Sequence, residues 1–316
     1  MLKKIILLLS LLTLLSACTP VAAAPEVKPV MEVATASVPT QQVEPESDGI
    51  TAEEEPASIP TARPTQAPDV WMELPIVPEV SDTARAIYQR GQEMGNNPHV
   101  FSKIGDCQNV TSHFLGVYEK PGQFSLGEEY AYLQETIDYF KGSFSRDSLA
   151  VKGGFNVAAI LSPLRADKEA CQPNESPVAC EIRANNPSFV IISLEEWWAN
   201  KPAEEYEAYL QKIVGYTIDQ GVVPILATKA DDLEGDNGIN QVIARVAYDY
   251  DIPLWNFWKA VQPLPNAGLT EDGFHLTFSG DAGNRFDDPD RMKFAWAWRN
   301  LTALQALDAV RHGVTE

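Results

Sequence analysis

Residues 187–194 read PSFVIISL, a run in which only two serines interrupt the apolar side chains. A strand with one wet face alternates apolar and polar residues, so this run predicts a strand covered on both faces. Residues 222–228, VVPILAT, form a second apolar run of strand length. Two covered strands predict a parallel sheet that is buried between layers of helices.

Helical patterns flank these two runs. Residues 203–219 place apolar and aromatic side chains at helical spacing, and Gly221 follows as a stop signal. Strands that alternate with helices predict parallel βαβ units with right-handed crossovers, whose ligands bind beyond the carboxyl ends of the strands. The other patterns predict short strands at 100–104 and within 252–257, and helices over 126–140, beginning at 156–161, over 239–250 and over 291–310.

Two short motifs offer chemistry. Gly105-Asp106-Cys107 follows the first expected strand, so Cys107 is either a nucleophile at a carboxyl end or a buried thiol. Later, LTEDGFHLTF places Asp272 three residues before His275, and a carboxylate on the same turn can fix the tautomer of a catalytic imidazole. Taken alone, this Asp-x-x-His pair is also common in ordinary surface loops.

Together, the Gly-Asp-Cys motif, the PSFVIIS strand and the Asp-x-x-His pair before the last helix resemble the SGNH or GDSL hydrolase family, over roughly residues 99–312. The resemblance implies a flavodoxin-like three-layer α/β/α fold with a parallel sheet, and hydrolysis of esters, often of acyl groups on lipids or carbohydrates. It implies Cys107 as nucleophile, His275 as base and Asp272 as its orienter. The oxyanion would bind the backbone N–H groups of Cys107 and of Gly154, or alternatively of Gly153. No metal or organic cofactor is implied.

The chain departs from the family in two motifs. A cysteine replaces the usual nucleophilic serine, which is chemically sensible because a thiolate is a good nucleophile. The family's Gly-x-Asn-Asp, whose Asn donates to the oxyanion, is replaced by Glu195-Glu196-Trp197-Trp198. We expect Glu195, Trp197 and Trp198 to contact the substrate.

These departures leave a second hypothesis open. A catalytically inactive protein of the same fold could bind cell-surface glycan or a protein partner through Trp197-Trp198 and the aromatic side chains of WNFW, residues 255–258. The more ordinary interpretation of these aromatic residues is packing in the core.

The N-terminus has the features of an export signal. Lys3 and Lys4 precede eleven largely apolar positions, 5–15, which are too few to span a bilayer. Leu15-Ser16-Ala17-Cys18 resembles the bacterial lipoprotein motif, which implies that residues 1–17 are removed and that Cys18 carries lipid. We therefore expect a lipid-anchored protein of the cell envelope, outside the cytoplasm. An ordinary signal peptide with an incidental cysteine is the alternative.

Composition divides the rest of the chain. Residues 18–69 hold nine of the 23 prolines and many acidic residues, which predicts a disordered tether, whereas residues 70–316 hold all seven tryptophans and predict one domain. A net charge of −20 argues against nucleic acid as a partner. We expect a monomer.

Two further segments have a structural interpretation. Cys171 and Cys180 bracket an eight-residue loop and are natural disulfide partners in an oxidising compartment. The acidic segment KADDLEGDNG, residues 229–238, lacks the glutamate that an EF-hand loop requires, so we interpret it as a solvated turn rather than a calcium site.

Overall fold

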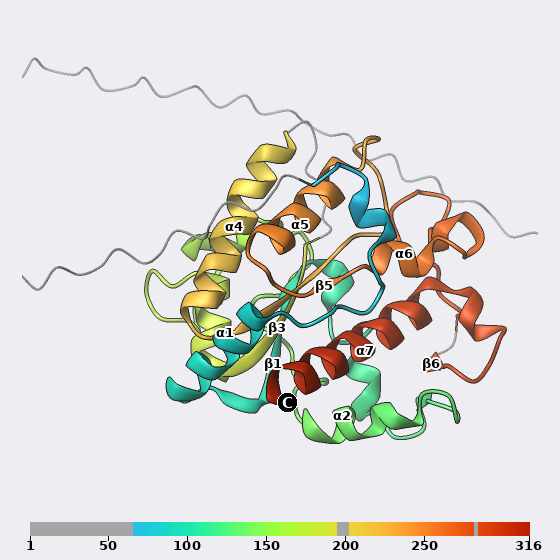
Figure 1. The fold of residues 1–316 in the computed structure, drawn as a ribbon, viewed down its shortest axis with the longest axis horizontal. Coiled ribbons are helices and arrows are strands. Elements are labelled where there is room, and N and C mark those ends of the chain that lie inside the picture. Colours follow the sequence, from blue (N-terminus) through green and yellow to red (C-terminus); the bar gives the residue numbers. More distant parts are fainter. Residues whose placement is uncertain (1–65, 195–201, 281–283) are drawn as a thin grey trace, which may run out of the picture. The chain divides into compact units, whose positions relative to one another are not determined.

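The computed structural model describes residues 66–194, 202–280 and 284–316 (Figure 1). The chain divides into two units, 1–57 and 58–316, and all described residues belong to the second. The predicted signal peptide, most of the predicted tether, and four predicted functional residues lie outside the described residues; these four are Cys18, Glu195, Trp197 and Trp198.

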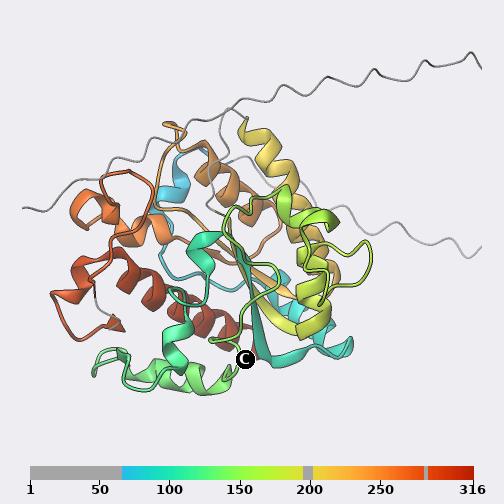
Figure 2. The same cartoon turned by 180° about the vertical axis from the view of Figure 1, so that it is seen from behind.

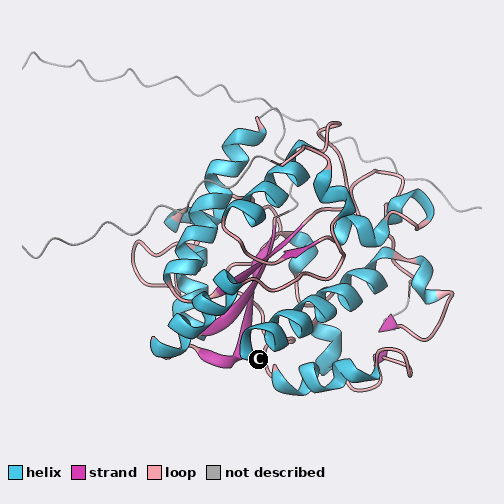
Figure 3. Cartoon of the chain, in the orientation of Figure 1, coloured by secondary structure: helices cyan, strands magenta, loops and turns pink. Residues whose placement is uncertain are grey.

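A parallel four-stranded sheet forms the centre of the second unit (Figure 3). Its order is β1-β3-β4-β5, and Gly105 at the end of β1 forms a further parallel bridge to Val151. Every residue of β3 is buried, as the near-continuous apolar run predicts. The strands are β1 (Asn97–Gly105), β3 (Pro187–Ser193), β4 (Val223–Ala227) and β5 (Leu254–Trp255), and a small separate sheet pairs β2 (Phe124–Ser125) with β6 (Asn284–Arg285).

Helices cover both faces of the central sheet. Helices α1 and α7 contact each other in front of the sheet in Figure 1, and Figure 2 brings α3 to the front from behind. Helices α4 and α5 also pack on each other and on β4. The predicted flavodoxin-like three-layer α/β/α fold is confirmed. The helices are α1 (Asp82–Glu93), α2 (Gln134–Tyr139), α3 (Pro177–Asn185), α4 (Ala203–Asp219), α5 (Gly238–Asp249), α6 (Phe257–Val261) and α7 (Ala295–Thr315).

The helix prediction was wrong where capping and proline chemistry compete with the apolar pattern. The helix expected to begin at 156–161 is only a 3-10 turn, Ala159–Leu161, because Pro163 supplies no N–H and disfavours helical backbone before it. Over 126–140 only a 3-10 turn, Ala131–Leu133, and α2 are helical. Helices α1 and α3 were not predicted, although serine caps begin both.

A group of buried charged residues supports the loop that leads from β1 back to the sheet edge. Glu181 on α3 accepts hydrogen bonds from Ser102 Oγ at 2.7 Å and from the Leu149 N–H at 2.8 Å. It also pairs with Arg146 at 2.6 Å. The neighbouring Cys180 forms a disulfide with Cys171 in the structure, so α3 is tied to the loop before it.

Lys103 is the buried cation of this region, and it gives the fold a testable dependence on pH. Its Nζ donates to Thr111 Oγ1 at 2.9 Å and to the Phe144 carbonyl at 3.3 Å. Burial, together with the nearby Arg146 guanidinium, lowers the pKa of Lys103 from 10.5 to about 8. Between these values the unfolded chain holds a proton that the folded chain lacks, so the free energy of unfolding rises as the pH rises.

We expect Lys103→Met to remove this rise. In the wild type it amounts to at most about 3 kcal/mol between pH 8 and 10.5, since each pKa unit corresponds to about 1.4 kcal/mol. Urea unfolding of both proteins at several pH values in this range measures this rise in the free energy of unfolding. Subtracting the value for Lys103→Met from that for the wild type at each pH removes the contribution of the tyrosines, which titrate in both proteins. Identical pH dependence in the two proteins would show that Lys103 keeps its charge in the fold.

Candidate active site

The nucleophile candidate stands on a tight turn at the carboxyl end of β1. A 3-10 turn, Cys107–Asn109, follows the strand, and Asp106 caps it by accepting a hydrogen bond from the Gln108 N–H at 2.9 Å. Gly105 has no space for a side chain, because a Cβ there would lie 2.1 Å from Asn109 Nδ2. The half-buried Cys107 is not part of the disulfide and is held at the edge of the sheet where parallel α/β folds bind ligands.

Cys107 and His275 line the same pocket. It has a volume of about 400 Å³, and Gly153 contributes to its wall. The fold thus brings the two separate sequence motifs to one cavity of a size typical for small-molecule sites. Its other described lining residues are Gln108, Val110, His113, Leu276, Phe278 and Trp296.

Asp272 orients His275. Its Oδ2 lies 2.6 Å from His275 Nδ1, and its Oδ1 accepts hydrogen bonds from Thr270 Oγ1 at 2.7 Å and from the backbone N–H groups of Phe274 and His275 at 2.9 Å. The bond to His275, followed by these others, holds the pKa of Asp272 well below its usual range. An ionised carboxylate only accepts, so Nδ1 carries the proton and Nε2 is left to act as a base.

Of the two predicted oxyanion glycines, Gly153 is the neighbour of Cys107. A Cβ built on Gly153 would lie 3.8 Å from Cys107 Cβ, whereas one built on Gly154 would meet no atom within 4 Å. Gly154 has a φ of 82°, a left-handed conformation that glycine adopts without strain. Gly153, and not Gly154, is among the residues that line the pocket.

A buried arginine that the sequence analysis missed supports the nucleophile turn. Arg299 on α7 is fully buried, and its Nη2 donates to Ser193 Oγ at 2.8 Å and to Asn109 Oδ1 at 3.4 Å. Asn109 Nδ2 in turn donates to the Ser193 carbonyl at 2.6 Å. The guanidinium lies 4.8 Å from the ring centroid of Phe114 and 4.9 Å from that of Phe257. These contacts connect the turn, the end of β3 and α7.

The aromatic segment 255–258 is buried except for Trp258, which is half-buried. Trp255 is fully buried, stacks on Phe114 and donates from Nε1 to Thr302 Oγ1 at 3.0 Å. The ring of Trp258 packs edge-on against Trp71 at 4.9 Å. The packing interpretation is confirmed for Trp255 and Phe257, which are fully buried, so Trp255 offers no surface to a glycan or a partner.

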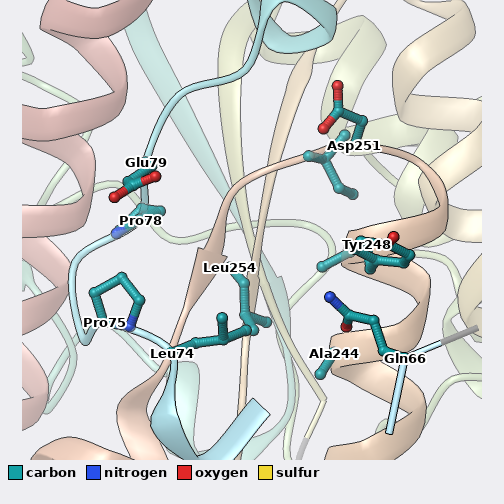
Figure 4. A pocket seen from close by; sticks show the side chains of 11 residues that line it. Gln66, Leu74, Pro75, Pro78, Glu79, Ala244, Tyr248, Asp251 and Leu254 are labelled. Carbon is teal, nitrogen blue, oxygen red and sulfur yellow. The ribbon is translucent and has the colours of Figure 1, made fainter. Parts of the chain in front are cut away.

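A second hollow, of about 390 Å³, lies between the segment before α1 and helix α5 (Figure 4). Leu74, Pro75 and Leu254 form apolar walls, and Asp251 stands at one end. The Asp251 carboxylate accepts a hydrogen bond from Thr83 Oγ1 at 2.6 Å. Neither Cys107 nor His275 lines this hollow, so the candidate active site is the Cys107 pocket.

Two groups of described side chains have the spacing of metal ligands, and neither includes a residue of the Cys107 pocket. One contains Cys171 and Cys180, whose sulfurs form the disulfide. In the other, Asp232 accepts from the N–H groups of its own loop and Glu234 pairs with Lys229 at 2.6 Å. These carboxylates organise the acidic loop itself.

Comparison with known proteins adds similarity of structure only. The chain matches no protein-family model, and no curated protein sequence matches it significantly. The solved structures to which this chain is similar include a GDSL-like lipase and an acetylxylan esterase. A GDSL-like lipase from Bacteroides thetaiotaomicron is 15% identical with a TM-score of 0.39, and 71% of this chain and 97% of that chain are covered. TesA is 16% identical with a TM-score of 0.38, covering 65% and 99%. An acetylxylan esterase from Geobacillus stearothermophilus is 16% identical with a TM-score of 0.35, covering 56% and 86%.

At these identities and TM-scores, the similarity says nothing about the site residues or the substrate of this chain.

Among the described residues, no helix is both long and apolar enough to cross a bilayer.

Proposed function

We propose that this protein is an SGNH-type hydrolase that cleaves acyl esters or thioesters with Cys107 as its nucleophile. The observation that supports this most directly is that Cys107 and His275 line one pocket while Asp272 lies 2.6 Å from the far nitrogen of His275. A nucleophile, a base and a group that orients the base are the parts that acyl transfer requires.

In the proposed mechanism, His275 Nε2 takes the Cys107 thiol proton as Sγ attacks the acyl carbon. The carbonyl π electrons move to oxygen, and the backbone N–H groups of Cys107 and Gly153 stabilise that charge. Collapse expels the alcohol or thiol, which receives its proton from His275, and leaves a thioester on Cys107. Water, deprotonated by His275, then releases the acid and restores the thiol. Asp272 keeps the imidazole in one tautomer throughout.

The lining of the pocket supports an uncharged, apolar acyl group as the substrate. Val110, Leu276, Phe278 and Trp296 provide its apolar walls, and neither a carboxylate nor an ammonium group is among its described lining residues. Phe278 is half exposed and stands at the solvent side. The alcohol part of the substrate, a lipid or carbohydrate in our proposal, would lie outside these walls.

A panel of p-nitrophenyl acyl esters and acyl thioesters, assayed with the full chain, tests this function. We expect turnover of uncharged acyl groups and much slower turnover of a succinyl ester of similar length, because a carboxylate would lose its solvation in an apolar pocket. An absence of turnover on every ester and thioester would overturn the proposal.

We further propose that the protein acts outside the cytoplasm, anchored to a membrane by lipid on Cys18. The support is the Leu-Ser-Ala-Cys motif and the Pro- and Glu-rich segment after it, which would let the domain reach surface polymers. Mass spectrometry of the mature N-terminus tests this. A lipid-modified Cys18 is expected, and an unmodified N-terminus at another residue would contradict it.

A further inference from the structure

Gln108 has a buried amide group that the mechanism above does not use. Gln108 follows Cys107 directly in the sequence and is only 3% exposed. It lines the same pocket as Cys107 and His275. Both Nε2 and Oε1 are buried, and neither has a hydrogen-bond partner among the described residues. The hydrogen bond from the Gln108 backbone N–H to Asp106 does not explain why this residue is a glutamine, since every residue except proline offers that N–H.

Such an amide is costly in a folded protein. A buried donor or acceptor without a partner destabilises the fold by about 1–3 kcal/mol, and most buried polar side-chain atoms are paired. A leucine would fill similar space without this cost. An amide kept beside a nucleophile, in a pocket, therefore points to a ligand atom that pairs with it.

We propose that Gln108 is a catalytic residue whose Nε2 donates to the acyl oxygen as it becomes an oxyanion. This inference rests on the proposed function. In the attack step the Sγ–C bond forms, the carbonyl π pair moves to oxygen and the thiol proton passes to His275, so negative charge appears on the oxygen alone. The terminal torsion of glutamine has a broad energy profile, which allows the amide to turn toward that oxygen.

The position of Gln108 also accounts for a departure in the sequence. The SGNH family donates to its oxyanion from an Asn side chain, and Trp197 stands at that position here. Gln108 supplies an amide N–H from a different element, the turn of Cys107–Asn109. The oxyanion site would then combine one side-chain donor with the N–H groups of Cys107 and Gly153.

Gln108→Leu separates this role from a structural one. We expect kcat to fall about 10²- to 10³-fold, as when one oxyanion donor is lost, with little change in KM. The urea midpoint should stay equal or rise, because the variant removes an unpaired amide. A structural role would instead lower the midpoint together with the activity.

A second measurement does not depend on turnover. An alkyl trifluoromethyl ketone forms a reversible hemithioketal with a cysteine nucleophile and places an oxyanion at the same position. We expect Gln108→Leu to weaken its binding about 10²-fold or more. Alkylation of Cys107 by iodoacetamide creates no oxyanion, so its rate should be unchanged. Gln108→Met is the second variant without a donor should the leucine variant fail to fold, and Gln108→Glu, which puts a carboxylate in the same place, should bind the ketone more weakly still.

The outcomes distinguish this inference from the proposed function. If the wild type hydrolyses esters and binds the ketone, and Gln108→Leu does both equally well, the role of Gln108 is overturned while the hydrolase remains. If the wild type itself neither hydrolyses esters nor binds the ketone, the hydrolase and the role of Gln108 fail together.

Discussion

Cys107→Ala is expected to lower kcat for ester hydrolysis by about 10⁴-fold or more, the largest effect that the site predicts. The variant removes the atom that forms the acyl bond, and the remaining groups of the pocket can only position substrate and water. Binding is expected to change little, because the walls that contact the acyl group are intact. The measurement is steady-state hydrolysis of a p-nitrophenyl ester by the full chain.

Cys107→Ser is the matched variant, because it keeps the size of the side chain and replaces the thiol by a hydroxyl. The His275–Asp272 pair is the arrangement that activates a serine in related chemistry, so turnover should remain measurable. Urea unfolding of all three proteins controls for stability. Equal rates for wild type and Cys107→Ala would show that another group carries the reaction.

Asp272→Asn is expected to lower kcat by about 10³- to 10⁴-fold with little change in KM, the second largest effect. The substitution keeps the shape of the side chain but removes the acceptor that fixes the proton on His275 Nδ1. The imidazole can then adopt the wrong tautomer, in which Nε2 already holds a proton and cannot accept one. Parallel measurements of kcat and KM separate this loss of catalysis from a loss of binding.

Asp290→Asn provides the matched control for Asp272→Asn. Asp290 is also an exposed aspartate whose pKa is lowered, in this case by Lys293, which lies 2.6 Å away. It contacts no histidine among the described residues and should leave kcat unchanged. A similar loss in both variants would indicate a general charge effect in place of an oriented base.

The lowered pKa of Asp272 also fixes what low pH should do. A carboxyl group whose folded pKa is depressed stabilises the fold above its ordinary pKa of about 3.9, and this contribution is lost as the pH falls through the lower folded value. Asp272 therefore remains ionised across the pH range in which hydrolysis would be assayed. The pH–rate profile of the wild type between pH 5 and 9 should contain no step from Asp272.

Local patterns in the sequence predicted the parts of the fold whose side chains repeat regularly. The buried run before Leu194 predicted β3, and the spacing over 203–219 predicted α4 to the residue. The loop expected between Cys171 and Cys180 ends earlier than predicted, because α3 begins at Pro177, where Ser176 and Pro177 are start signals. Pattern and capping signals have to be weighed together.

The site was predictable where its chemistry is local. Asp272 and His275 are three residues apart, and the structure brings them together as the motif predicts. The resemblance favoured Gly154 over Gly153 as the oxyanion glycine, whereas Gly153 is the one that lines the pocket; the choice depends on the path of the backbone. Arg299 gave no signal in the sequence, because its role comes from contacts that only the folded chain defines. Gln108 gave none either, because only the folded chain buries its amide without a partner among the described residues.

The most direct test of the central claim is to trap the acyl-enzyme. The full chain is mixed with a p-nitrophenyl ester, quenched with acid during the first turnover and analysed by intact-mass and peptide mass spectrometry. We expect one acyl group, attached to Cys107 and released by hydroxylamine as a thioester is. Acylation at another residue, or complete turnover with no acyl group on Cys107 at any time, would contradict it.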